Sequence, residues 1–309
     1  MTAHPSPAHL VERAARLLRQ SGGLGGTERL IEDGISESAD PSAVPAPAST
    51  PAITVSLSGR GLPAAGLVAG GGPALAESAL EQAGLIAWRG KRSRIAEEFR
   101  IIQGQVLQTL LVADRAPGDV SALRNLVMVT STRPGEGKSF SALNLAAAIA
   151  RYGQRHVLLV DADAKVHSLS AKLGLGQAPG LLELAQDPTR RADTLIFPTA
   201  LDSLFVLPIG GSAEAALTGP SLPIPQVLAA IGRAHPGLLV VVDAPPCLGS
   251  SDPSNLAPLV GQTVFVIEAE RTRRHEVESA LDLIASCSNI ALLLNKMQFT
   301  SSNTFGAYA

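Results

Sequence analysis

A short stretch in the middle of the chain combines the residue types that hold a triphosphate. It runs from Val127 to Ser139 with the sequence VMVTSTRPGEGKS, and a helical run, Phe140 to Tyr152, follows it. Backbone N–H groups of such a turn bind phosphate oxygens, a lysine reaches the outer phosphates, and a hydroxyl holds Mg²⁺. Here the lysine is Lys138 and the hydroxyl belongs to Ser139. The sequence therefore predicts a phosphate-binding loop for a nucleotide, a P-loop.

The loop departs from the strict spacing G-x-x-x-x-G-K-[ST], because Thr132 stands where the first glycine is expected. Gly135 and Gly137 are present, so a turn remains feasible. The alternative is an ordinary Gly/Pro loop between a strand and a helix, and the strand–loop–helix context favours nucleotide binding. The residues predicted to contact the nucleotide are Pro134, Gly135, Glu136, Gly137, Lys138, Ser139 and Phe140.

Two further apolar runs end in aspartate. The run 157–160 leads to Asp161 and Asp163, and the run 238–242 leads to Asp243. In a parallel sheet these ends lie on the same edge as the P-loop, and Mg²⁺ prefers oxygen ligands. A lone aspartate in such a place more often caps the next helix, but two such strands beside a P-loop favour a metal site. We expect Mg²⁺ to be held by Ser139, Asp161, Asp163 and Asp243.

The spacing Asp161-x-Asp163 predicts a second role, because alternate residues of an extended segment face the same side. One carboxylate would hold the water molecules of the metal, and the other would accept a proton from an attacking hydroxyl. The spacing leaves open which aspartate has which role.

These residues need a sheet that brings them to one edge. Apolar runs predict strands at 125–131, 156–161, 203–208, 238–243, 262–268 and 290–295. Helical spacing predicts helices at 93–111, 138–152, 168–173, 224–233, 253–258 and 274–287. The alternation predicts an α/β fold with a doubly wound, mainly parallel sheet of P-loop NTPase type, preceded by a short helix and a flexible linker.

The composition predicts four regions in the 309 residues. They are a short amphipathic helix at 1–20, a linker at 21–81 rich in Pro, Gly, Ala and Ser, the folded domain at 82–298, and a mobile tail at 299–309. A net charge of −2 argues against nucleic acid as a partner. Cys247 and Cys287 have no metal-ligand or redox spacing, and the chain has no long apolar run. We therefore expect a cytoplasmic protein, for which any role at a membrane would need a partner.

The three motifs together resemble the Walker A, A′ and B motifs of the bacterial tyrosine kinases, which are relatives of the partition and septum-site ATPases. The similarity extends over about residues 94–296. The segments 10–19 and 95–100 further resemble the cytoplasmic autokinases of exosortase-associated exopolysaccharide clusters. This resemblance implies ATP and Mg²⁺ as cofactors, phosphoryl transfer to tyrosine, and regulation of exopolysaccharide synthesis or export. It also implies a homo-oligomer and an activating partner, the membrane-bound chain-length (co-polymerase) protein.

The resemblance also implies roles for single residues. Lys138 would contact the outer phosphates and Ser139 would bind Mg²⁺. Asp161 would be the proton acceptor or a metal contact, with Asp163 and Asp243 assisting the metal. Asn295, at the end of the last predicted strand, would adjoin the adenine. Arg133 lies where the partition ATPases place a lysine that crosses the dimer interface, and an exposed turn arginine is the alternative.

The chain departs from the family at its interface helix and at its C-terminus. The pattern Glu-x-x-Arg-x-x-Arg is met by Glu97 and Arg100 but not by Gln103. Kinases of this type end in a cluster of tyrosines, whereas this chain has only two. Tyr152 follows a predicted buried helix face and reads as structural, which leaves Tyr308 as the candidate phosphoacceptor, with an ordinary terminal tail as the alternative. The alternatives are a partition-type ATPase switch and a regulatory scaffold that binds nucleotide without turnover.

Overall fold

The computed structural model describes residues 70–86, 93–113, 122–153, 155–211 and 222–297, which all lie in one compact unit of the chain, Thr54–Ala309. The predicted helix at 1–20, residues 21–69 of the predicted linker, and the tail with Tyr308 lie outside the described residues. Within the described ranges, no helix is long and apolar enough to cross a membrane.

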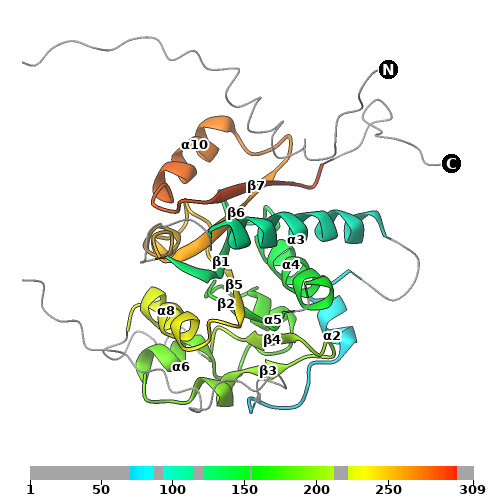
Figure 1. Ribbon diagram of the computed structural model, residues 1–309, viewed down its shortest axis with the longest axis vertical. Coiled ribbons are helices and arrows are strands. Elements are labelled where there is room, and N and C mark those ends of the chain that lie inside the picture. The colour runs from blue at the N-terminus through cyan, green and yellow to red at the C-terminus, as the bar shows by residue number, and fades with distance from the viewer. Residues whose placement is uncertain (1–69, 87–92, 114–121, 154, 212–221, 298–309) are drawn as a thin grey trace, which may run out of the picture. The chain divides into compact units, whose positions relative to one another are not determined.

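The described residues contain one sheet of seven strands in the order β3-β4-β2-β5-β1-β6-β7 (Figure 1). The strands are β1 Leu123–Ser131, β2 Val157–Asp161, β3 Phe197–Pro198, β4 Leu204–Leu207, β5 Leu239–Asp243, β6 Val260–Glu268 and β7 Ile290–Asn295. Strand β3 is antiparallel to β4, and all other neighbours are parallel. The predicted doubly wound, mainly parallel sheet is therefore confirmed.

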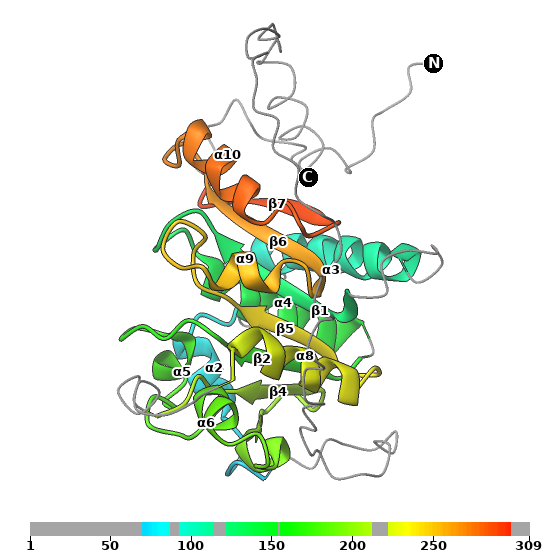
Figure 2. The ribbon, with the colours of Figure 1, turned by 90° about the vertical axis from the view of Figure 1, so that its left-hand side faces the viewer.

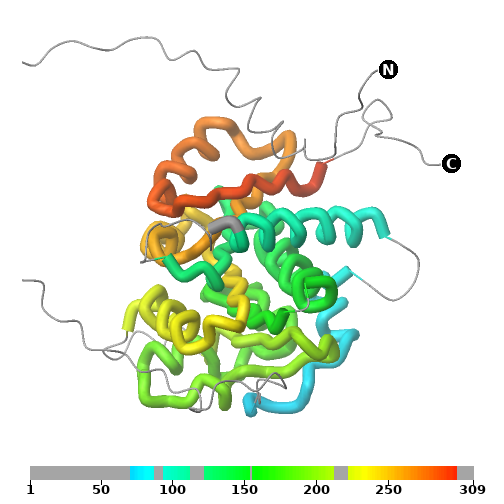
Figure 3. The backbone as a smooth tube through the Cα atoms, in the orientation of Figure 1, coloured from blue at the N-terminus to red at the C-terminus, as the bar shows by residue number. Residues whose placement is uncertain are grey.

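Helices cover both faces of this sheet. They are α2 Glu77–Gln82, α3 Arg94–Ala113, α4 Lys138–Tyr152, α5 Leu169–Lys172, α6 Leu181–Gln186, the 3₁₀ turn η1 Ala192–Leu195, α8 Ile224–Ala234, α9 Asp252–Leu256 and α10 Arg274–Leu283. Helices α3 and α4 lie on one face, whereas α8, α9 and α10 lie on the other (Figures 1 and 2). The tube view shows the chain crossing from one face to the other between strands (Figure 3).

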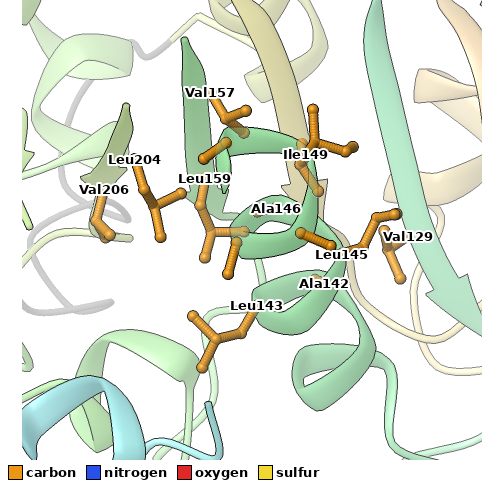
Figure 4. Packing of buried hydrophobic residues seen from close by; sticks show 14 of the residues in the cluster. Val129, Ala142, Leu143, Leu145, Ala146, Ile149, Val157, Leu159, Leu204 and Val206 are labelled. Carbon is orange, nitrogen blue, oxygen red and sulfur yellow. The ribbon is translucent and has the colours of Figure 1, made fainter. Parts of the chain in front are cut away.

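Helix α4, which begins in the predicted P-loop, is the centre of the core. Its side chains from Ala142 to Ile149 are buried against β1, β2 and β4, with Val129, Leu159 and Val206 among the facing residues (Figure 4). Seven of its fifteen residues are small Ala or Ser, which lets the helix approach the strands closely. Burial of α4 therefore fixes the end of the helix that carries Lys138.

The linker predicted for residues 21–81 ends too late, because residues 70–81 belong to the packed domain. Gly71 N–H donates to Ile196 O (3.0 Å), and Leu75 forms an isolated bridge with Thr199 beyond β3. Leu80 of α2 is fully buried. The predicted helix at 274–287 is also shorter and ends at Leu283, while α2, α6, η1 and β3 were not predicted. These short elements depend on tertiary contacts, which a sequence pattern does not contain.

Candidate functional site

The P-loop follows β1 and enters α4 through two glycines with left-handed backbone. The φ angles are 90° at Gly135 and 99° at Gly137, and a Cβ at Gly137 would lie 2.0 Å from the side-chain nitrogen of Asn295. Thr132 is not among the residues with positive φ. The loop therefore needs glycine at the two positions that have it, and a threonine at the position of the missing first glycine is tolerated.

The shape of this loop is held by the side chain of Glu136. Its Oε2 accepts hydrogen bonds from the N–H groups of Thr132 (2.7 Å) and Arg133 (3.0 Å), and its Oε1 accepts one from the hydroxyl of Thr272. The carboxylate is buried, and it acts on the first amides of the loop as a phosphate would. The predicted contact of Glu136 with nucleotide is thus restricted to its backbone, because its side chain is an internal brace.

Three consecutive amides of the loop remain for a ligand. Among the described residues, the N–H groups of Gly135, Glu136 and Gly137 have no hydrogen-bond acceptor. Such a run of free amides before a helix N-terminus binds phosphate oxygens. The ring of Phe140 packs edge-on against Phe99 with the centroids 5.9 Å apart, and its predicted contact with the nucleotide stays a prediction.

Lys138 binds two carboxylates from neighbouring strand ends. Its Nζ lies 2.7 Å from Asp163 Oδ2 and 3.1 Å from Asp243 Oδ1, and it donates to Ser139 Oγ (3.1 Å). The lysine side chain is only 8% exposed. Burial opposes its charge, but the carboxylates of Asp243 and Asp163 outweigh that effect, so the pKa of Lys138 is raised. Of the three aspartates predicted at this edge, Asp163 and Asp243 therefore meet Lys138 in the fold.

Asp243 carries an oxygen that no described residue satisfies. Its Oδ2 is buried without a hydrogen-bond partner. Burial, together with the neighbouring charge of Asp161, raises the pKa of the Asp243 carboxyl to about 6, although Lys138 acts in the opposite direction. An unpaired buried carboxylate oxygen next to a hydroxyl is a group that a hard cation can bind.

These donors fit Mg²⁺ bound together with a nucleotide. Within the described ranges, no three His, Cys, Asp or Glu side chains gather closely enough to hold a metal ion by themselves. Mg²⁺ usually takes one or two carboxylates and completes its shell with water and phosphate oxygens. Ser139 and Asp243 can supply such protein ligands, with Asp163 close by across Lys138.

Asp161 lies on the same edge but is bound differently. Asp161 on β2 lies opposite Asp243 on β5 in the strand register, yet its carboxylate does not contact Lys138. Instead it accepts three hydrogen bonds, from the backbone of Asp163 and from Ser170. No sequence pattern points to Ser170, because only the fold brings the start of α5 against the end of β2.

Asn295 braces the P-loop, and its predicted role at the adenine remains a prediction. Its side-chain nitrogen donates to Glu136 O (2.9 Å), and the adjacent Lys296 donates to Gly135 O (2.7 Å). Arg133 is 59% exposed and forms an ion pair with Glu276 of α10 at 2.6 Å. The end of β7 and the start of α10 therefore hold the loop from the outside.

Two other predicted features are placed by the structure. Gln103 is buried on α3, whereas Glu97 and Arg100 are exposed and pair with each other at 3.4 Å. The third position of the interface pattern thus faces the core. Tyr152 was predicted to be structural, but it lies at the end of α4 with 44% exposure, and the Arg151 guanidinium stands 5.8 Å from its ring centre.

Comparison with known proteins matches the chain to a family of nucleotide-binding domains. A model of the CbiA family, the CobQ/CobB/MinD/ParA nucleotide binding domain, matches residues 127–301. The chain is 31% identical over 191 residues to a "Putative tyrosine-protein kinase EpsB" of Ralstonia solanacearum, which covers 55% of this chain and 25% of that protein. It is 26% identical to "Tyrosine-protein kinase YwqD" of Bacillus subtilis strain 168, over 74% of this chain and 92% of that protein.

A solved structure is similar over most of its length. The "chimerical protein CapA2B2" matches with a TM-score of 0.53 and 26% identity, over 73% of this chain and 94% of that chain. The chain spans only a quarter of the length of the EpsB protein. The resemblance to bacterial tyrosine kinases and to the partition and septum-site ATPases is confirmed by these matches.

Proposed function

The chain belongs to the family of CobQ/CobB/MinD/ParA nucleotide-binding domains, and we propose that it is an ATP-dependent protein-tyrosine kinase that regulates exopolysaccharide synthesis or export. One observation carries the proposal: Lys138 and the carboxylates of Asp163 and Asp243 meet beside three free amides of the P-loop. The names of the relatives EpsB and YwqD as tyrosine-protein kinases support this choice over other nucleotide-dependent activities.

The arrangement suits phosphoryl transfer, which depends mainly on positioning and on neutralising charge. The amides of Gly135, Glu136 and Gly137 would hold the phosphates, and the flexible stem of Lys138 would carry its ammonium from the carboxylates to the outer phosphates. Bound Mg²⁺ would neutralise the β- and γ-phosphate oxygens. Ser139, Asp163 and Asp243 would hold that ion, directly or through water.

The acceptor hydroxyl needs a base. A tyrosine hydroxyl that attacks the γ-phosphorus must lose its proton, and the two candidates are Asp161 and Asp163. Tyr308 of a neighbouring copy, or a tyrosine of a partner, would be the acceptor. Tyr152 is a second candidate, because it is half-exposed at the far end of α4 from the P-loop and would also have to act in another copy.

The cellular setting follows from the same proposal. The kinase would work in the cytoplasm as a homo-oligomer. Its activator would be the cytoplasmic part of a membrane-bound chain-length protein, which would recruit it to the inner membrane. No nucleic acid is required.

A second function is favoured by the scarcity of tyrosine, of which the chain has only two. A partition-type ATPase switch would use the same loop and carboxylates to hydrolyse ATP with water as the acceptor. A scaffold that binds nucleotide without turnover would use the loop alone.

Incubation with γ-labelled ATP and Mg²⁺ separates these functions. The samples are the wild type, Lys138→Met, Tyr308→Phe and Tyr152→Phe. Label that is lost in Lys138→Met and in one of the tyrosine variants supports the kinase and identifies the acceptor. Release of inorganic phosphate without labelled protein would support the switch instead, and tight binding without either product would support the scaffold.

A further inference from the structure

Asp161 is the most completely bound of the three aspartates at the site. It is fully buried, and its Oδ1 accepts a hydrogen bond from Asp163 N–H (3.1 Å). Its Oδ2 accepts two, from the N–H of Ser170 (2.7 Å) and from the hydroxyl of Ser170 (2.6 Å). A carboxylate oxygen has two lone pairs, so Oδ2 is saturated and Oδ1 keeps one free direction.

The direction of the Ser170 hydroxyl is fixed by a third partner. Ser170 Oγ accepts a hydrogen bond from Ile209 N–H at 2.9 Å. An amide can only donate, so the single proton of the hydroxyl is left for Asp161. Ser170 is itself fully buried, and the chain from Ile209 through Ser170 to Asp161 crosses from the segment after β4 to the end of β2. Each hydrogen bond in this series therefore has only one possible donor.

We propose that Ser170 is a positioning residue, which turns Asp161 Oδ2 away from the site and leaves one oxygen, Oδ1, to bind the water shell of Mg²⁺. Asp163 differs, because both of its oxygens face lysines, Lys138 at 2.7 Å and Lys165 at 3.4 Å, and its carboxylate is 8% exposed. Asp163 is therefore oriented by two ammonium groups and not by a hydroxyl. The proposal rests on the proposed nucleotide function and concerns how Asp161 is oriented toward the metal.

The size of the effect follows from comparable sites. Groups that orient a metal ligand from behind change metal affinity ten- to a hundredfold when they are removed. Ser170→Ala removes the hydroxyl but keeps the backbone N–H bond to Asp161. We therefore expect the loss to lie near the lower end of this range, about tenfold.

The experiment measures binding of a fluorescent ATP analogue to the full chain, once with Mg²⁺ and once with EDTA. The dissociation constant in EDTA divided by the dissociation constant in Mg²⁺ reports how strongly metal and nucleotide are coupled. We expect this ratio to fall about tenfold in Ser170→Ala, while the dissociation constant in EDTA stays unchanged. Ser168→Ala is the matched control, because Ser168 caps the same helix through Ala171 N–H (3.2 Å) and does not contact Asp161.

A purely structural role gives a different result. Loss of a buried hydrogen bond lowers the melting temperature of Ser170→Ala whether Ser170 positions Asp161 or only stabilises the fold. The melting temperature is therefore recorded but does not distinguish the two roles. A coupling ratio equal to that of the wild type, in a folded Ser170→Ala protein, overturns the proposal. If Ser170→Ala does not fold, Ser170→Cys keeps a weak donor at nearly the same size, and its ratio must fall as well. A wild type that binds no nucleotide would overturn the proposed function itself, which is a separate result.

Discussion

The clearest test of the site's electrostatics is the substitution Asp243→Asn in metal-free protein. Asp243 lies at the end of β5, fully buried, with one oxygen on Lys138 and the other without a partner. Burial and the nearby Asp161 raise the pKa of the Asp243 carboxyl from 3.8 to about 6. Ionisation of this carboxylate is therefore less favourable in the folded protein than in the unfolded chain.

The sign and size of the effect on the free energy of unfolding follow from the linkage between proton binding and folding. Because the folded-state pKa of Asp243 lies above the unfolded value, the neutral carboxyl contributes its whole stabilising effect below pH 3.8. This contribution is lost as the pH rises through 6. A shift of about two units corresponds to about 3 kcal/mol at pH 8 and to about half of that at pH 5. Because Asn resembles the neutral carboxyl, Asp243→Asn should stabilise the folded protein by these amounts. At about 2–4 °C per kcal/mol, the melting temperature at pH 8 should rise by roughly 6–12 °C.

Circular dichroism melting in EDTA at pH 8 and pH 5 measures this effect. Asp282→Asn is the control, because Asp282 lies exposed on α10 and its substitution should leave the melting temperature unchanged at both values. A lower melting temperature of Asp243→Asn than of the wild type at pH 8 would refute the reasoning. It would mean that the ion pair with Lys138 outweighs the cost of burying the carboxylate.

Two other substitutions test the frame of the site. Gly137→Ala places a methyl group 2.0 Å from Asn295 at a φ of 99°, so ATP affinity should fall at least about tenfold. Gly104→Ala is the control in the same titration. Its Cβ meets nothing within 4 Å, so the affinity for ATP should be unchanged. Asn125→Ala removes the amide that donates to three backbone carbonyls between Gly232 and Leu238. Urea unfolding should show a loss of about 2–4 kcal/mol, with ATP binding by the folded protein retained.

The sheet and its carboxylates could be predicted because their signals are local. Buried parallel strands are continuous apolar runs, and those of β2 and β5 lead directly to Asp161 and Asp243. Once the strands are parallel, their ends must meet at the P-loop edge. The prediction therefore needed no knowledge of individual contacts.

The braces of the site could not be predicted, because each joins segments far apart in the chain. Glu136 meets Thr272 across 136 residues, and Asn295 meets the loop across 159. Glu136 also shows why a motif residue can be misread. In the sequence it stands among the phosphate contacts, but a carboxylate there is repelled by phosphate, and the fold turns it onto the loop's first amides.

The charges of the site explain why the stability of the ligand-free protein and its metal-dependent binding of nucleotide should change in opposite directions in Asp243→Asn. Asp161, Asp163 and Asp243 are buried beside the buried ammonium of Lys138, and the more exposed ammonium of Lys165 lies 3.4 Å from Asp163. Three negative and two positive charges therefore leave an excess of one negative charge when all are ionised. This excess is unfavourable in the folded protein and repels phosphate. A divalent cation that enters with the nucleotide removes both costs at once. The carboxylate of Asp243 therefore lowers the stability of the ligand-free protein and strengthens metal-dependent binding, and Asp243→Asn should raise the first while weakening the second.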